Sequence, residues 1–284
     1  MNKLPLQKRA QILACLVEGN SVRATCRLTG AAKGTVLKLL ADVGEACAIY
    51  QDRTLRNLPC ERVQCDEIWS FCYAKEKNLP DDKRGVPGYG DVWTWTAIDA
   101  DTKLMVSWMI GGRDSHAARA FMEDLAPRLA KRVQLTTDGH KPYLTAVGNA
   151  FANKVDFAML VKIYDRPKDA GPQRKYSPEK FCGATKTVIE GNPNPAAIST
   201  SFVERQNLTM RMGMRRFTRL TNGFSKKVEN LHHAVALHFM HYNFARIHKS
   251  LRVTPAMEAG VSDHVWSLEE IAALADESVR TNAA

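Results

Sequence analysis

The stretch that decides the fold is Arg62-Val-Gln-Cys-Asp-Glu-Ile-Trp-Ser-Phe71. Its apolar and aromatic residues are typical of a short strand, and two adjacent carboxylates, Asp66 and Glu67, stand in its middle. On a strand these neighbours point to opposite faces. A carboxylate in an apolar strand needs a reason, because burying an unpaired charge is costly. For Asp66 that reason is a functional role, an ion pair with an arginine, or a place at an exposed strand end.

The segments after this strand predict an α/β fold around a mixed sheet. Residues 92–98 and 104–110 have the β-branched and aromatic content of two strands, and we interpret Asp99 and Asp101 as residues of the hairpin turn between them. The other expected elements are a helix at 115–131, a strand at 133–137, a helix at 143–151, a strand at 157–164, an irregular polar region at 165–198, and helices at 199–217 and 228–245.

Three carboxylates are candidates for a shared site. Asp66 lies on the first strand, which we expect to be central, and Asp138 follows the fourth strand, which we expect to neighbour the first. Glu204 lies on the helix at 199–217. Carboxylates that converge from two strands and a helix suit hard cations, which take oxygen ligands. Two Mg²⁺ ions (or Mn²⁺) about 4 Å apart would activate a water and stabilise the leaving oxygen of a phosphodiester.

The same helix carries a second signal. At 100° per residue, Arg211 and Arg215 lie within about 20° of the direction of Glu204. A carboxylate and two guanidinium groups on one face suit a metal beside a phosphate backbone. The alternative is an exposed helix with intrahelical ion pairs, although Glu204 and Arg211 are too far apart in sequence for an i,i+4 bridge.

The first 48 residues predict a helix-turn-helix. Three short helical patterns are separated by tight turns, with Gly30 in the second turn, and seven basic side chains stand against three acidic ones. In such a motif Lys33 and Thr35 would reach base edges, while Lys38 would meet phosphate. The alternative is a small packing module of three helices.

The whole chain fits a nucleic-acid partner better than other partners. Its 284 residues carry a formal net charge of +10, which points to a polyanion. It lacks a run of eighteen apolar residues and the apolar core of a signal peptide, so we expect neither a membrane span nor secretion. Seven irregularly spaced cysteines without a Cys-x-x-Cys pair indicate neither a zinc ribbon nor a disulfide framework, and favour a reducing cytoplasm.

Four motifs in order resemble those of bacterial insertion-sequence transposases of the DDE, RNase H-like superfamily, and look most like the insertion-sequence-one type. They are Cys65-Asp-Glu-Ile-Trp-Ser-Phe71, Thr136-Thr-Asp-Gly-His-Lys-Pro-Tyr143, Phe202-Val-Glu-Arg-Gln-Asn-Leu208 and Tyr242-Asn-Phe-Ala-Arg-Ile-His-Lys-Ser-Leu251. The resemblance covers about residues 60–260. Some relatives carry an N-terminal cysteine zinc motif, which this chain lacks.

The resemblance implies a Mg²⁺-dependent triad at Asp66, Asp138 and Glu204, in an enzyme that cuts double-stranded DNA at element ends and joins it to target DNA. It also implies an RNase H-like domain at 60–255, which we place after a DNA-binding domain at 1–52 and before a helical tail at 256–284. Two ends must be held together, so we expect a dimer or larger on DNA, within a bacterial nucleoid. A non-transposing nuclease and a catalytically silent DNA-binding regulator remain alternatives.

Overall fold

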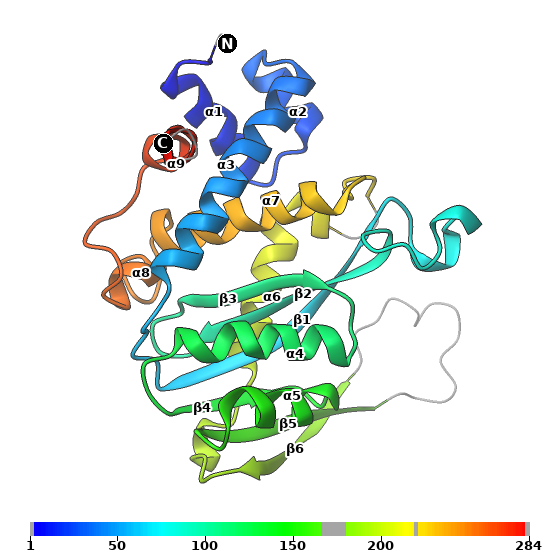
Figure 1. Ribbon diagram of the computed structural model, residues 1–284, viewed down its shortest axis with the longest axis vertical. Coiled ribbons are helices and arrows are strands. Elements are labelled where there is room, and N and C mark those ends of the chain that lie inside the picture. The colour runs from blue at the N-terminus through cyan, green and yellow to red at the C-terminus, as the bar shows by residue number, and fades with distance from the viewer. Residues whose placement is uncertain (1–2, 166–179, 219–220, 282–284) are drawn as a thin grey trace.

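The computed structural model describes residues 3–165, 180–218 and 221–281. Its centre is one six-stranded mixed sheet with the strand order β3-β2-β1-β4-β5-β6 (Figure 1). β1 pairs in parallel with β4 and antiparallel with β2. The strands are β1 (Arg62–Cys72), β2 (Gly90–Asp99), β3 (Met105–Gly111), β4 (Val133–Thr137), β5 (Val155–Asp165) and β6 (Lys180–Glu190).

The position of β1 confirms that the first strand is central and neighbours the fourth. Its side chains are almost continuously buried, as expected for a strand that is covered on both faces. In the parallel register Cys65 lies beside Thr137, so the chain leaves β4 next to Asp66. The sheet alone therefore brings Asp66 and Asp138 together.

Helices cover the two faces of the sheet separately (Figure 1). On one face lie α4 (Ser115–Leu125) and α5 (Pro142–Phe151), whose apolar side chains surround Trp95 of β2. On the other face lie α6 (Ser201–Gly213) and α7 (Val228–Met240), which pack around Ile68 of β1. The chain continues from α7 as a π-helical turn, His241–Ala245.

The N-terminal helices pack against α7 and against the C-terminal end of the described chain. α1 contacts α9, and Arg9 donates two hydrogen bonds to the carboxylate of Asp276, at 2.8 and 2.9 Å. α3 runs along both α7 and α9, down to the sheet (Figure 1). The helices are α1 (Leu6–Val17), α2 (Val22–Thr29), α3 (Lys33–Thr54), the short α8 (Pro255–Glu258) and α9 (Leu268–Thr281).

The turn between α2 and α3 agrees with the sequence pattern. Gly30 ends α2 with φ at 70°, a left-handed conformation that glycine adopts without strain. Val36 and Leu40 are buried, while Lys33 and Lys38 are exposed at the start of α3. The division into domains at 1–52, 60–255 and 256–284 stays a prediction.

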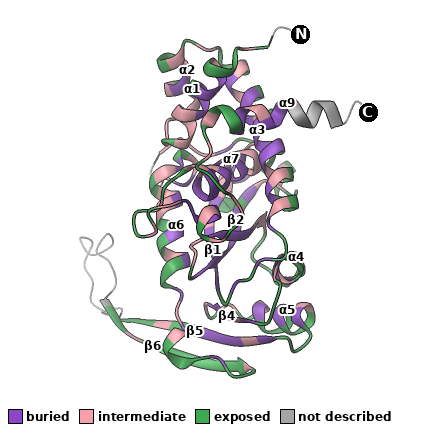
Figure 2. Cartoon of the chain, turned by 90° about the vertical axis from the view of Figure 1, so that its left-hand side faces the viewer, coloured by how far each residue is buried: buried purple, intermediate pink, exposed green. Residues whose placement is uncertain are grey.

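Some expectations about regular elements were wrong. The helix expected at 115–131 ends at Leu125 as α4, and a 3₁₀ turn, Ala126–Arg128, follows it. Residues 180–190 form β6, although the region 165–198 was expected to be irregular; residues 166–179 lie outside the described residues. β6 is largely exposed, so it lacks the apolar alternation that marks a strand in sequence (Figure 2).

No helix in the described ranges is long and apolar enough to cross a bilayer.

A further correction concerns α6, which ends at Gly213 and does not reach residue 217. Met214 is extended, and a separate 3₁₀ turn, Arg215–Phe217, follows. Helical periodicity therefore does not carry Arg215 onto the face of Glu204, whereas Arg211 remains on the helix. The break turns Arg215 toward the N-terminal helices, where it lines a cleft with Lys33.

Candidate metal centre and basic cleft

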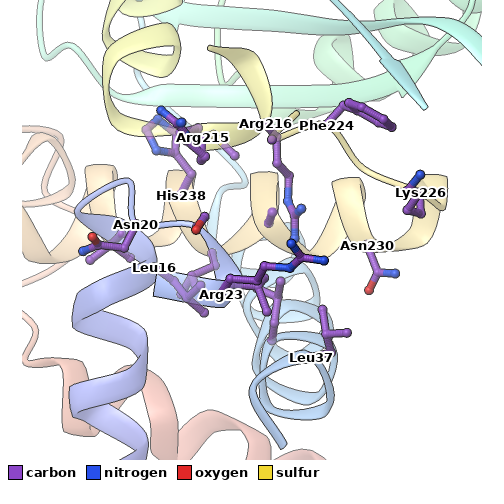
Figure 3. Close-up of a pocket in the computed structure, with 18 of the residues that line it drawn as sticks. Leu16, Asn20, Arg23, Leu37, Arg215, Arg216, Phe224, Lys226, Asn230 and His238 are labelled. Carbon is purple, nitrogen blue, oxygen red and sulfur yellow. The ribbon is translucent and has the colours of Figure 1, made fainter. Parts of the chain in front are cut away.

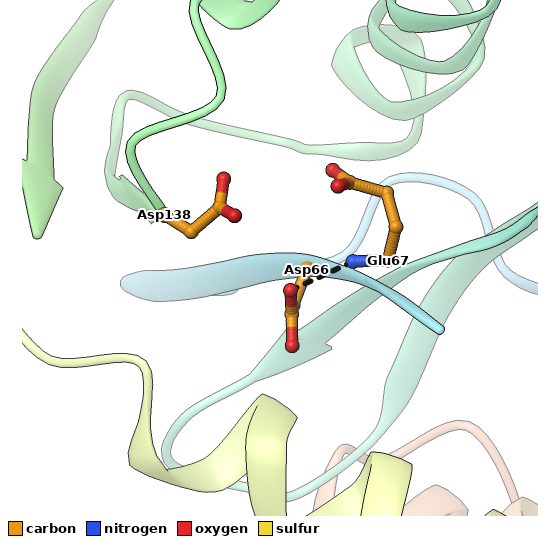
Figure 4. A group of neighbouring side chains, drawn as sticks. All are labelled: Asp66, Glu67 and Asp138. Carbon is orange, nitrogen blue, oxygen red and sulfur yellow. Dashed lines mark hydrogen bonds between the residues drawn. The ribbon is translucent and has the colours of Figure 1, made fainter. Parts of the chain in front are cut away.

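Three carboxylates meet where the middle of β1 adjoins the C-terminal end of β4. One oxygen from each of Asp66, Glu67 and Asp138 lies within 4.8 Å of the others. Asp66 and Glu67 point to opposite faces of β1, as predicted, and Asp138 stands just past the end of β4 (Figure 4). Glu67 was not among the predicted site residues, although its place beside Asp66 was visible in the sequence.

Asp66 is oriented by hydrogen bonds from both sides. Its Oδ1 accepts the backbone N–H of Glu67 at 2.8 Å, and its Oδ2 accepts Nδ2 of Asn207 on α6 at 2.9 Å. Burial raises the pKa of Asp66 to about 6, and the negative charge of Asp138 adds to this. The carboxylate is thus fixed in direction and short of positive charge.

Glu67 has a fully buried side chain on the other face of β1. It accepts a hydrogen bond from the hydroxyl of Tyr143 on α5, and another from Nε of Arg113 at 3.0 Å. Burial raises the pKa of Glu67 to about 7, with a further contribution from the charge of Asp138.

Arg113 connects two of these acids. Its Nη2 lies 3.4 Å from Oδ2 of Asp138 while its Nε binds Glu67, and its guanidinium lies 4.8 Å from the ring centre of Trp93. Asp138 is also held by the backbone N–H of His140, which donates to Oδ1 at 2.9 Å. Arg113 therefore supplies positive charge to Glu67 and Asp138 together.

Glu204 lies outside the group of three but faces it. It is three residues before Asn207 on α6, hence on the same side of the helix, and its charge contributes to the raised pKa of Asp66. Its carboxylate accepts hydrogen bonds from Lys162 of β5 and, at 2.7 Å, from Thr200. A lysine thus neutralises Glu204 in the same way that Arg113 neutralises Asp138.

The donor set fits a hard divalent cation. All available groups are carboxylate oxygens, which Mg²⁺ and Mn²⁺ prefer, and the charge of Asp138 adds to the burial that raises the pKa of Asp66. Arg113 and Lys162 lie in ion pairs with three of the four acids, Arg113 with Glu67 and Asp138, and Lys162 with Glu204. A cation among the acids would take over the role of these two side chains and release them toward a bound anion.

A second feature is a basic cleft between the N-terminal helices and the segment from α6 to α7 (Figure 3). Its volume is about 910 Å³, and no acidic residue is among the described residues that line it. Arg23 and Arg216 point into it from opposite walls (Figure 3). Burial lowers the pKa of Arg216 to about 10. The basic lining residues are Arg23, Lys33, Arg215, Arg216, Lys226 and Lys227.

Of the predicted DNA-contacting residues, two line the basic cleft and three lie outside its lining. Lys33 and Arg215 line the cleft, and both are exposed. Thr35 is half-buried on α3, and Lys38 forms an i,i+4 ion pair with Asp42 at 2.9 Å outside the cleft lining. Arg211 is half-buried on α6 and is not part of the lining either.

Comparisons with known proteins give distant similarity to solved structures. No protein-family model matches the chain, and no curated protein matches it. Among solved structures, the chain is similar to one described as a cryo-EM structure of piggyBac transposase synaptic complex with hairpin DNA. The TM-score is 0.44 at 11% sequence identity, over 98% of this chain and 72% of that chain.

The raised pKa values predict how the metal-free protein responds to pH. A carboxylate whose folded pKa lies above its unfolded value contributes stability at low pH, and this is lost as pH rises through the folded pKa. For Asp66 and Glu67 the loss should occur between about pH 4 and pH 7. We expect Asp66→Asn to be more stable than wild type at pH 8 in EDTA, by on the order of 2 kcal/mol, and to gain much less at pH 4.

Thermal unfolding at both pH values would measure this difference. Asp156→Asn is the matched control, because Arg132 lowers the pKa of Asp156 and the sign is reversed. That variant should lose stability at pH 8. An Asp66→Asn variant that is equally destabilised at both pH values would contradict the raised pKa of Asp66.

Proposed function

We propose that this protein is a DNA transposase that cuts the ends of an insertion sequence and joins them to target DNA in a Mg²⁺-dependent reaction. The observation that carries the proposal is the partly buried carboxylate cluster where the middle of β1 adjoins the end of β4, with Glu204 facing it from α6. The basic cleft supports a polyanionic substrate on the same molecule.

In this proposal Asp66, Asp138 and Glu204 hold two metal ions. When bound, the ions would activate a water or a 3′-hydroxyl and stabilise the charge on the leaving oxygen. Asn207 keeps Asp66 directed at the site, through the hydrogen bond to Oδ2. Arg113, whose side chain is 37% exposed, would turn from Asp138 toward a phosphate once the acids are neutralised.

We infer the parts played by the N-terminal helices and the arginines from position and charge. Residues 1–52 would form the helix-turn-helix domain, with the start of α3 entering the major groove. Arg215 would contact phosphate in the basic cleft, and Arg211 would do so nearer to Glu204. Residues 60–255 would form the RNase H-like catalytic domain.

Two copies would hold two DNA ends, so light scattering should find a dimer or larger on paired ends.

The base-reading role of α3 gives a separate prediction. Lys33→Ala and Thr35→Ala should each weaken binding to end DNA by about 1–3 kcal/mol and relax preference at particular base pairs. Lys38→Ala should weaken binding to all sequences alike, because lysine on phosphate carries no sequence information. Competition between end DNA and scrambled DNA at fixed salt would measure both effects. Equal losses on both DNAs for Lys33→Ala and Thr35→Ala would exclude α3 as the reader.

Cutting and joining of labelled end DNA by the purified full chain would test the function itself. We expect products with Mg²⁺ or Mn²⁺ and none with EDTA. Cutting without joining would favour the alternative of a non-transposing RNase H-like nuclease. Sequence-specific binding without cutting under any metal would favour a catalytically silent DNA-binding regulator.

A further inference from the structure

A row of aromatic rings runs from the carboxylate cluster to the basic cleft, and the proposed chemistry does not use it. We call Trp93, Trp69, Phe71 and Phe224 the aromatic row. Trp69 of β1 lies opposite Trp93 of β2 in the antiparallel register, so both project from one face of the sheet. Phe71 follows two residues later on that face, with its ring centre 5.8 Å from that of Trp69. Phe224 is next, at 4.7 Å from Phe71.

The first ring of the row touches the candidate metal centre. Arg113, which binds Glu67 and Asp138, lies over the ring of Trp93. The last ring, Phe224, lines the basic cleft (Figure 3). The aromatic row therefore bridges the metal centre and the basic cleft, to both of which the proposed function assigns a nucleic acid.

Positive charge accompanies the rings along the row. Nζ of Lys75 lies 5.7 Å from the ring centre of Trp69 and 6.0 Å from that of Phe71. Nζ of Lys226, a lining residue of the cleft, lies 4.9 Å from the ring of Phe224. In a nucleotide, the flat base can stack on such a ring and the phosphate can pair with such a lysine. A ring beside a lysine therefore matches both the base and the phosphate of a nucleotide.

These rings differ from the core aromatic on the same face of the sheet. Trp95, two residues after Trp93, is fully buried among Phe121 and Tyr143. All four members of the aromatic row are only partly buried. Each ring of the row therefore keeps part of its surface accessible to a ligand.

We propose that the aromatic row is a stacking platform for unpaired bases, which holds a single-stranded segment of the substrate between the carboxylates and the basic cleft. The inference rests on the proposed function for the identity of the polymer. It commits to unpaired DNA, because bases inside a duplex are stacked on each other and present only their edges in the grooves. The strand would leave the metal centre past Trp93 and enter the cleft at Phe224.

The test compares DNA with and without an unpaired tail. Fluorescence anisotropy in EDTA, where no cutting occurs, would give the affinity of the full chain for a blunt duplex and for the same duplex with a short single-stranded tail. Wild type should prefer the tailed DNA. Because Phe71 lies outside the cleft lining, Phe71→Leu should lose about tenfold in affinity for tailed DNA, as expected for one lost base-stacking contact, with blunt-duplex affinity unchanged. Phe224→Leu should lose more affinity for tailed DNA than for the blunt duplex.

Phe181→Leu is the matched control. Phe181 is an exposed ring on β6, where its ring centre lies 6.0 Å from that of Tyr164, outside the aromatic row. This variant should keep the preference for tailed DNA. Retained binding to the blunt duplex would show that the row variants are folded.

The outcomes separate this proposal from the proposed function. Wild type without a preference for tailed DNA would overturn the platform, and so would row variants that lose tailed and blunt DNA equally. Either result leaves Mg²⁺-dependent cutting untouched. A wild-type protein that never cuts DNA, but prefers tails through Phe71 and Phe224, would refute the chemistry and support the platform.

Discussion

Asp66→Asn and Asp138→Asn should each reduce Mg²⁺-dependent cutting of DNA by about 10³-fold or more, a loss typical of removing an essential member of a catalytic unit. Each variant replaces a charged oxygen with a neutral group of the same shape, so a divalent ion loses a ligand while packing is kept. DNA affinity should change little, because it comes mainly from basic residues such as those of the cleft.

Single-turnover cutting, with anisotropy measured in parallel on the same DNA, would separate the two effects. Glu123→Gln is a suitable control, since Glu123 is an exposed carboxylate that pairs with Arg119 on α4. It should cut as wild type does. Wild-type cutting by Asp138→Asn would show that Asp138 is not a metal ligand. The proposed metal centre would then have no ligand from the end of β4.

The pairing of Asp66 with Asp138 was predictable because it follows from strand order. Apolar strands at 62–71 and 133–137 are visible in the sequence, and the parallel pairing of β1 with β4 then brings the acids to one end. The burial of Val36 and Leu40 on α3 was predictable from helical spacing in the same way.

The parts that escaped prediction depend on contacts between distant segments. Glu67 receives its partners from Tyr143 and Arg113, which lie far away in the sequence. The strand β6 is exposed and polar, so tertiary pairing with β5 decides its conformation. The basic cleft is assembled from the ends of several helices and a connecting segment, and no local pattern marks such an assembly.

The choice between Glu204 and Glu67 as the third metal ligand is open to a direct experiment. Proximity favours Glu67, which belongs to the group within 4.8 Å. Direction and access favour Glu204. Asp66 points at α6, where Glu204 lies with its side chain 39% exposed, while Glu67 is sealed on the opposite face by Tyr143 and Arg113. A catalytic ion needs coordination sites that water and substrate can reach. An ion bound to a fully buried carboxylate would have no such sites.

We therefore expect Glu204→Gln to abolish cutting to the same degree as Asp66→Asn and to weaken Mn²⁺ binding measured by calorimetry without DNA. Glu67→Gln should reduce cutting by only about tenfold, because Glu67 acts through Arg113 on the position of Asp138 and does not touch the ion. Its Mn²⁺ affinity should stay near that of wild type.

Lys162→Met tests the role of Glu204 from the other direction, because Lys162 forms an ion pair with the carboxylate of Glu204. Without this competing cation, Glu204 is free for the metal, and Mn²⁺ should bind more tightly than in wild type. The reverse pattern, in which Glu67→Gln loses Mn²⁺ and Glu204→Gln keeps it, would make Asp66, Glu67 and Asp138 the metal ligands. Glu204 would then serve only to anchor α6 to β5 through Lys162.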